Sequence, residues 1–245
     1  MGGVDGGVDG APARLTKPDA DRPTVPDRLA IWLFGPLVRR CITGIIGFGP
    51  TGGGIVRIVV VGTSGAGKTT LAQAIATTLG IPHIELDALH WDPGWRSLSL
   101  CDPGEFIRRV ATATAREAWV VDGNYGLVRE VTWGRATHLV WLDYDRPIIM
   151  WRVIRRTCVR ALSRTELWSG NVERWRNLLK PSHPIRWAWN TWRRRRAEYE
   201  ALLADDEHAH LVVHRLRRPA EVNHIVQGLA REAASGSQRG ATIST

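Results

Sequence analysis

Eight consecutive residues, Gly62–Thr69, have the types and spacing needed to bind a chain of phosphates. They match the pattern Gly-x-x-x-x-Gly-Lys-[Ser/Thr] in full. The glycines allow backbone N–H groups to point at phosphate oxygens. Lys68 can reach the β- and γ-phosphates, and the Thr69 hydroxyl can ligate Mg²⁺. We therefore predict ATP and Mg²⁺ as cofactors, bound by Gly62, Ser64, Gly65, Ala66, Gly67, Lys68, Thr69 and Thr70.

Two aspartates stand where buried strands are expected to end. Asp122 follows the apolar run 119–121, and Asp87 follows the run 83–86. The carboxyl ends of parallel strands open into the crevice where α/β proteins bind ligands. We predict that Asp122 holds Mg²⁺ or its waters, and a simple turn before Gly123 is the alternative. Asp87 could orient a phosphate acceptor or take its proton, or it could only cap the next segment.

An arginine recurs every four residues at Arg152, Arg156, Arg160 and Arg164, which places the four side chains on one face of a helix. Neighbouring like charges repel each other unless an anion offsets them, and a polyphosphate is such an anion. An arginine that reaches the transferring phosphoryl group can accelerate the reaction by about 10³–10⁵-fold. We predict that Arg156, Arg160 and Arg164 are catalytic, and a solvated face or a nucleic-acid patch is the alternative.

The positive charge of the chain is concentrated in one segment. Between Trp151 and Arg196 there are 12 Arg and one Lys against two Glu, while the whole chain has a formal net charge of +9. The segment also holds six of the 12 Trp, most of which we expect to pack between helices. Because Trp and Arg stack on bases and the run Arg193–Arg196 could contact phosphate backbones, a nucleic acid is an alternative partner to a small molecule.

The composition is that of a globular protein without a disulfide framework or a zinc site. The chain has 245 residues, 44% of them hydrophobic and 23% charged, which suits one α/β domain with tails. Its three cysteines are widely spaced and include no Cys-x-x-Cys pair, as is typical of a reducing cytosol. The apolar stretches 29–38 and 42–48 are shorter than the ~18 residues that span a bilayer. We expect a cytoplasmic location and no transmembrane segment.

The apolar runs predict strands that alternate with helices. Strands are expected at 58–61, 83–86, 119–121, 139–142 and 211–213, and helices at 69–79, 103–116, from 147 onward, 185–203 and 220–231. Such alternation is typical of a parallel sheet with helices on both faces, so we predict an α/β P-loop NTPase fold with a five-stranded parallel sheet. Its kinase domain spans 55–232, between a mostly disordered extension over 1–54 and a disordered tail over 233–245.

Beyond the P-loop, three strings of residues resemble the adenylate-kinase-like P-loop kinases of the DNA topology modulation protein family. They are Leu-Asp-Ala-Leu-His-Trp with Pro-Gly-Trp at 86–95, Trp-Val-Val-Asp-Gly-Asn-Tyr at 119–125, and Arg-Thr-Glu-Leu-Trp-Ser-Gly-Asn at 164–171. The likeness covers about residues 56–230. It implies a nucleoside-monophosphate-kinase-like core of five parallel strands, an acceptor region at about 87–116 and a short Arg-rich lid at about 156–176.

The same resemblance implies roles for further residues. Asp122 looks like the Asp of the Asp-Gly-Phe-Pro-Arg string of adenylate kinases, which helps to organise Mg²⁺. Here Asn-Tyr-Gly at 124–126 replaces Phe-Pro-Arg, so the Arg is missing at that position and Arg129 is a candidate substitute. By likeness the loop 215–219 lies near the adenine, with Arg217 as its binding residue.

These observations predict an enzyme. We expect an ATP-dependent phosphotransferase that moves the γ-phosphate of ATP to a small acceptor, which could be a nucleotide. The acceptor region supplies Arg96, Arg108 and Arg109, which is compatible with a phosphorylated acceptor but does not select one. The alternative is a nucleic-acid-associated NTPase that influences DNA topology.

Overall fold

The computed structural model describes residues 56–163, 167–171 and 184–241. The strands are β1 (Arg57–Gly62), β2 (His83–Glu85), β3 (Trp91–Asp92), β4 (Arg96–Ser97), β5 (Trp119–Asp122), β6 (His138–Leu142) and β7 (Val212–Leu216). The α-helices are α3 (Lys68–Leu79), α4 (Leu86–His90), α5 (Leu98–Cys101), α6 (Pro103–Ala113), α7 (Arg129–Trp133), α8 (Arg146–Ser163), α9 (Pro184–Leu203) and α10 (Val222–Ala241).

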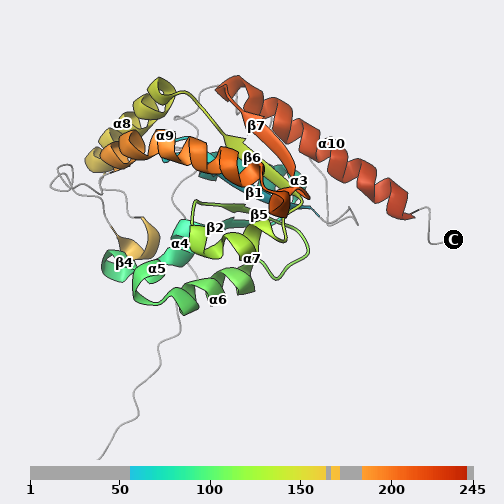
Figure 1. Ribbon diagram of the computed structural model, residues 1–245, viewed down its shortest axis with the longest axis horizontal. Coiled ribbons are helices and arrows are strands. Elements are labelled where there is room, and N and C mark those ends of the chain that lie inside the picture. Colours follow the sequence, from blue (N-terminus) through green and yellow to red (C-terminus); the bar gives the residue numbers. More distant parts are fainter. Residues whose placement is uncertain (1–55, 164–166, 172–183, 242–245) are drawn as a thin grey trace, which may run out of the picture. The chain divides into compact units, whose positions relative to one another are not determined.

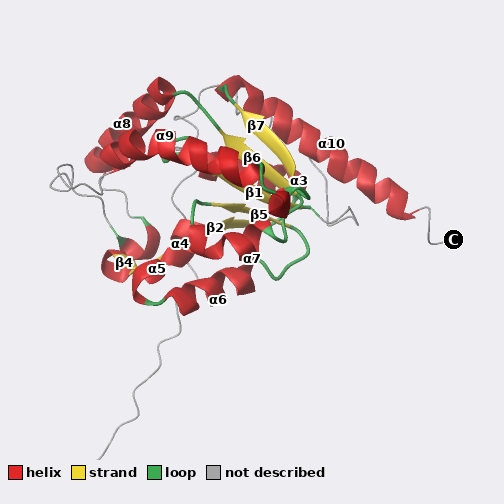
Figure 2. Cartoon of the chain, viewed as in Figure 1, coloured by secondary structure: helices red, strands yellow, loops and turns green. Residues whose placement is uncertain are grey.

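Five parallel strands form the central sheet in the order β2-β5-β1-β6-β7 (Figure 2). Strands β5, β1 and β6 lie inside the sheet, and nearly all of their residues are buried. The β-branched run 58–61 forms the middle of β1, as expected for a strand buried on both faces. The register places Gly62 beside Leu142 and Glu85 beside Asp122, so the ends of these strands meet at one edge of the sheet.

Helices cover both faces of the sheet (Figure 1). Residues of α3, α8 and α10 share one apolar core with Ile58 and Val60, while residues of α4, α5, α6 and α7 share the other core with Val59 and Val61. Helix α9 contributes to both cores, because Ala188 belongs to the first and Tyr199 to the second. The prediction of an α/β fold with a five-stranded parallel sheet flanked by helices is confirmed.

Several element boundaries differ from those that the sequence predicts. Strand β2 ends at Glu85, and Asp87 lies in the first turn of α4 instead of ending the strand. The stretch that follows contains two strands that were not predicted, β3 and β4, which pair as a short antiparallel hairpin. Strand β7 extends to Leu216, and α10 continues to Ala241, into the segment that was expected to be a disordered tail. None of the described helices is both long and apolar enough to cross a membrane.

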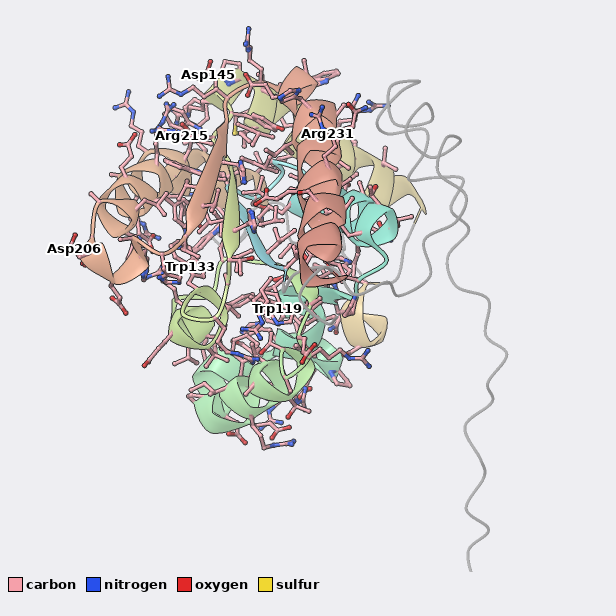
Figure 3. All side chains as sticks on the ribbon, turned by 90° about the vertical axis from the view of Figure 1, so that its right-hand side faces the viewer. Trp119, Trp133, Asp145, Asp206, Arg215 and Arg231 are labelled. Carbon is pink, nitrogen blue, oxygen red and sulfur yellow. The ribbon has the colours of Figure 1, made fainter. Side chains whose placement is uncertain are left out.

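A buried carboxylate ties together three elements at the edge of the sheet. Asp143 directly follows β6, and its side chain is 2% exposed. Its Oδ2 accepts hydrogen bonds from Arg196 of α9 at 2.8 Å and from Arg215 of β7 at 2.9 Å. In Figure 3 Arg215 is labelled on β7 and Asp145 at the start of α8. Asp143 therefore holds α9 against the last two strands of the sheet.

Candidate nucleotide and acceptor site

The loop between β1 and α3 requires glycine at two positions. Gly62 and Gly65 have φ angles of 148° and 84°, in the region that disfavours other residues. A Cβ on Gly62 would lie 2.7 Å from the Leu142 carbonyl oxygen, and one on Gly65 would lie 2.1 Å from Val153 Cγ2. The packed strand β6 and helix α8 leave no room for a side chain there. The loop thus keeps the tight course that a phosphate-binding backbone needs.

Thr69 and Asp122 lie together at the start of α3. The Thr69 hydroxyl donates to Asp122 Oδ2 at 2.6 Å, and His83 Nε2 lies 2.9 Å from Asp122 Oδ1. Asp122 is only 3% exposed, so these contacts fix its carboxylate. The predicted Mg²⁺ pair is therefore brought together at the C-terminal edge of the sheet.

The donor set near the P-loop fits a shared magnesium site, not a metal centre made by the protein alone. Among the described residues, no group of three His, Cys, Asp or Glu side chains could hold a metal ion. Mg²⁺ often keeps several waters and binds through one or two protein oxygens plus substrate phosphates. A hydroxyl and a carboxylate 2.6 Å apart at the P-loop, Thr69 and Asp122, fit that mode of binding.

Lys68 lies among charges of both signs. Burial lowers the pKa of its ammonium group, while the carboxylates of Asp122 and Asp87 raise that pKa. Arg156 and Arg195 lower the pKa by repulsion. The charges of both predicted site carboxylates, Asp122 and Asp87, therefore reach Lys68.

Helix α8 braces the P-loop with two of the predicted arginines. Arg152 Nη1 donates to the Ala66 carbonyl oxygen at 2.7 Å, and Arg156 Nη2 donates to Ser64 Oγ at 3.4 Å. The four-residue spacing thus correctly places these two side chains on one helix face, toward the loop. The side chain of Arg160 and the whole of Arg164 lie outside the described residues, so their catalytic roles stay predictions.

Helix α9 brings another arginine to the site, which the sequence analysis assigned to a surface charge run. The positive charge of Arg195 lowers the pKa of Lys68, and Arg195 Nη1 donates to Glu198 Oε2 at 3.0 Å. Glu198 also accepts a 2.7 Å bond from Arg129, whose guanidinium lies over the Trp133 ring. Arg129, the candidate substitute for the missing arginine, is therefore held by α9. The signal in the sequence was Glu198, three residues after Arg195 in a helix.

Asn124, which follows β5 and Gly123, bonds to the start of the P-loop. Its Nδ2 donates to the Gly62 carbonyl oxygen at 2.6 Å, and its Oδ1 accepts a 2.8 Å bond from Tyr199. Asn124 therefore has a structural role. Asn124 fixes the P-loop to β5 and α9, and sequence reasoning did not find this.

Asp87 lies in a cluster of polar and aromatic groups beyond the P-loop. Its Oδ1 accepts a 2.5 Å bond from the Tyr125 hydroxyl, and burial together with Asp87 raises the pKa of that hydroxyl. Glu85, at the end of β2, has its pKa raised mainly by burial and accepts a bond from the side chain of Trp168. Glu85 was not predicted as a site residue, because the predicted strand 83–86 ends one residue later than β2 does.

The short segment 167–171 docks on the β3–β4 hairpin. Asn171 Oδ1 accepts from the Trp95 backbone N–H at 2.9 Å, and its Nδ2 donates to the Asp92 carbonyl oxygen at 3.1 Å. Ser169 Oγ donates to the Trp91 carbonyl oxygen at 2.7 Å. The described part of the expected lid therefore contacts the expected acceptor region.

Two predicted nucleotide-binding residues lie at the periphery of this arrangement. Thr70 is in the first turn of α3 and is half-buried. Arg217 directly follows β7, is exposed, and donates its backbone N–H to Glu221 Oε2 at 2.8 Å. The nucleotide-binding roles of Thr70 and Arg217 stay predictions.

Comparisons with known proteins give one family match. The family described as ATPase family associated with various cellular activities (AAA) matches residues 58–114, which include the P-loop. No curated protein sequence matches the chain. The family match covers less than half of the chain and agrees with a nucleotide-binding P-loop.

Several solved structures are similar in fold. Shikimate kinase from Acinetobacter baumannii in complex with shikimate has 18% identity and a TM-score of 0.47, covering 74% of this chain and 94% of its own. A gluconokinase from Sinorhizobium meliloti 1021 has 23% identity and a TM-score of 0.41, and the match covers 77% of this chain and 94% of the gluconokinase. A sugar kinase from Janibacter sp. HTCC2649 has 19% identity and a TM-score of 0.39, and the match covers 72% of this chain and 92% of the sugar kinase.

Proposed function

We propose that the chain is a kinase that uses ATP and Mg²⁺ to phosphorylate a small acceptor. The observation that carries this proposal is that the charges of two carboxylates both reach Lys68. One of them, Asp122, accepts a hydrogen bond from Thr69, while the other, Asp87, lies in the first turn of α4 and accepts a hydrogen bond from Tyr125. A P-loop that only bound nucleotide would not need the second carboxylate.

In the proposed reaction the acceptor oxygen attacks the γ-phosphorus, and the bond from that phosphorus to the oxygen of the leaving ADP breaks. Asp87 orients the acceptor hydroxyl and takes its proton. The P-loop backbone and Lys68 hold the β- and γ-phosphates, and Arg156 stabilises the charge that develops on the transferring group. Thr69 and Asp122 would hold Mg²⁺, which would neutralise part of the phosphate charge.

The remaining assignments belong to the same proposal. Arg160 and Arg164 would close over the phosphates, and Arg217 would lie against the adenine. The resemblance to the DNA topology modulation family suggests an adenylate-kinase-like fold, a cytoplasmic location and a lid that excludes water and so suppresses ATP hydrolysis.

The test is ADP formation by the full chain with Mg²⁺ and ATP. We would compare ATP alone with ATP plus nucleoside monophosphates, free sugars, amino sugars or single-stranded DNA. Asp87→Asn should lower acceptor-dependent turnover by about 10²-fold or more, because the general base is lost. The exposed Asp205→Asn is the matched control. An Asp87→Asn protein with full turnover would remove this mechanism.

A nucleic-acid-associated NTPase is the second candidate, and one surface favours it. Arg193 and Arg194 of α9 are exposed, and Trp187 and Trp189 are 44% and 54% exposed on the same helix. Exposed Arg and Trp side chains suit phosphate backbones and unstacked bases. If single-stranded DNA alone stimulated ATP turnover, and Arg193→Glu with Arg194→Glu abolished that stimulation, this function would replace the kinase.

A further inference from the structure

The charges around the acceptor region indicate what kind of molecule it takes. We propose that the acceptor is an uncharged or positively charged small molecule with hydroxyl or amino groups that packs against tryptophan, and that it is not a nucleotide or another anion. This inference rests on the proposed function, because it names the acceptor of the same site.

Two carboxyl groups, those of Glu85 and Asp87, lie at the start of the acceptor region. Glu85 ends β2 beside Asp122 of β5, and Asp87 follows two residues after Glu85. The charges of Asp122 and Asp87 both act on Glu85. Asp122 is assigned to Mg²⁺, so Glu85 and Asp87 are the carboxyl groups that can repel an incoming carboxylate or phosphate. They favour donors of hydrogen bonds, such as hydroxyl and ammonium groups.

Each arginine of the acceptor region is already paired with a carboxylate, Asp92 or Glu105. Arg109 donates to Asp92 Oδ1 at 3.0 Å and to Glu105 Oε1 at 2.8 Å. Arg108 donates to Glu105 Oε2 at 2.7 Å, and Arg96 contacts Asp92 Oδ2 at 3.4 Å. An anionic acceptor would have to break these ion pairs to use the guanidinium groups. The three arginines therefore already have carboxylate partners, with which an anionic acceptor would have to compete.

The cations that act on the site lie on the nucleotide side. Arg156 of α8 and Arg195 of α9 both act on Lys68, and Arg156 bonds to Ser64 of the P-loop. The positive charge is thus positioned for the phosphates of ATP, whereas the acceptor side is negative. Such a separation suits a reaction in which the phosphate chain comes from one substrate alone.

Aromatic rings complete the acceptor side. Trp91, Trp95 and Trp168 are half-buried. The ring centroid of Trp95 lies 5.4 Å from that of Trp91 and 6.4 Å from that of Trp168. Trp168 is fixed by its bond to Glu85, and the backbone of Trp95 is fixed by Asn171. Ring faces next to carboxylates suit the apolar faces of sugar-like molecules and cationic amines.

The experiment compares probes that differ mainly in charge. The full chain, saturated with Mg²⁺ and a non-hydrolysable ATP analogue, is titrated with glucosamine, glucose, glucose 6-phosphate and gluconate, and with adenosine and AMP. Calorimetry measures binding, and tryptophan fluorescence reports contact with the rings. We expect the uncharged or cationic member of each set to bind at least about tenfold more tightly than the anion. That preference should shrink in Glu85→Gln, while the exposed Glu130→Gln keeps it.

Each outcome separates this inference from the kinase proposal. Tighter binding of the anions, or no binding by any uncharged or cationic probe, overturns the acceptor class. ADP formation that increases with AMP or glucose 6-phosphate supports the kinase and overturns the acceptor class. The expected binding preference without any acceptor-dependent ADP formation supports the acceptor class and contradicts the kinase.

Discussion

The arginines beside the P-loop and those of the acceptor region have opposite surroundings. Arg152 and Arg156 donate to a carbonyl oxygen and a hydroxyl of the P-loop. Arg108 and Arg109 donate to the Glu105 carboxylate, which holds the pKa of Glu105 at about 2. The first pair supports a loop that can bind phosphate, while the second pair is already bonded to the carboxylate of Glu105. The count of arginines in a segment therefore says little about its ligand until their partners are known.

The largest effect is expected where both regions meet, at Lys68. Lys68→Ala removes a cation whose charge interacts with both Asp122 and Asp87, so the transferring phosphate loses its proposed contact and the carboxylates lose an opposite charge. We expect acceptor-dependent turnover to fall by about 10³-fold or more. ADP formation measures this, and circular dichroism checks the fold. Residual activity near the wild-type level would place the phosphates elsewhere.

The nucleotide side can be tested with two neighbouring arginines of α8. Arg156 contacts Ser64 of the P-loop, whereas Arg155 is exposed on another face of the same helix. We expect Arg156→Ala to lower kcat by about 10²-fold, because a preorganised donor at the developing charge is lost. Arg155→Ala should change kcat less than about twofold. Equal effects of the two variants would show that only the overall charge of the helix matters.

The frame of the nucleotide side depends on the buried carboxylate of Asp143. Asp143→Asn leaves Arg196 and Arg215 without the charge that they share, so the free energy of unfolding should fall by about 3 kcal/mol. Urea unfolding measures this loss. The control is Asp145→Asn, because Asp145 is exposed two residues away. A similar stability of both variants would show that the ion pairs do not fix α9.

The features that the sequence predicted well depend on local pattern. The buried run 58–61, the helix after Lys68 and the loop glycines follow from the neighbours of each residue in the chain. Asp122 was also placed correctly, since the end of a strand fixes the position of its side chain. These parts needed no knowledge of distant contacts.

The features that the sequence missed depend on contacts between distant segments. Asn171 bonds to residues 92 and 95, and Asn124 bonds to Gly62 and to Tyr199 on α9. The run Arg193–Arg196 was predicted to form one surface that could contact phosphate backbones. In the structure Arg195 bonds to Glu198 and Arg196 bonds to Asp143. Helical periodicity places consecutive residues on different sides of a helix, but only the fold shows which carboxylates lie next to each of those sides.

The two regions should also respond differently to acid, since the arginines of the nucleotide side stay charged while the acceptor region contains a buried histidine. Burial lowers the pKa of His90, and Asp87 offsets this only in part. Its ring packs against Trp91 and Tyr125, and its Nε2 lies 2.8 Å from Ser99 Oγ. His90 is therefore neutral in the folded protein at pH values where the unfolded chain already binds a proton.

The sign of the effect follows from that difference. The contribution of neutral His90 to stability is complete above the unfolded pKa of about 6.5, and it is lost as the pH falls from there through the lower pKa of the folded state. We expect the free energy of unfolding of the wild type to decrease more steeply below about pH 6.5 than that of His90→Gln. Urea unfolding over a pH series measures both slopes, and the exposed His224→Gln should keep the wild-type slope. Identical slopes for the wild type and His90→Gln would mean that the acceptor region accepts a charged His90 without cost, which its aromatic packing argues against.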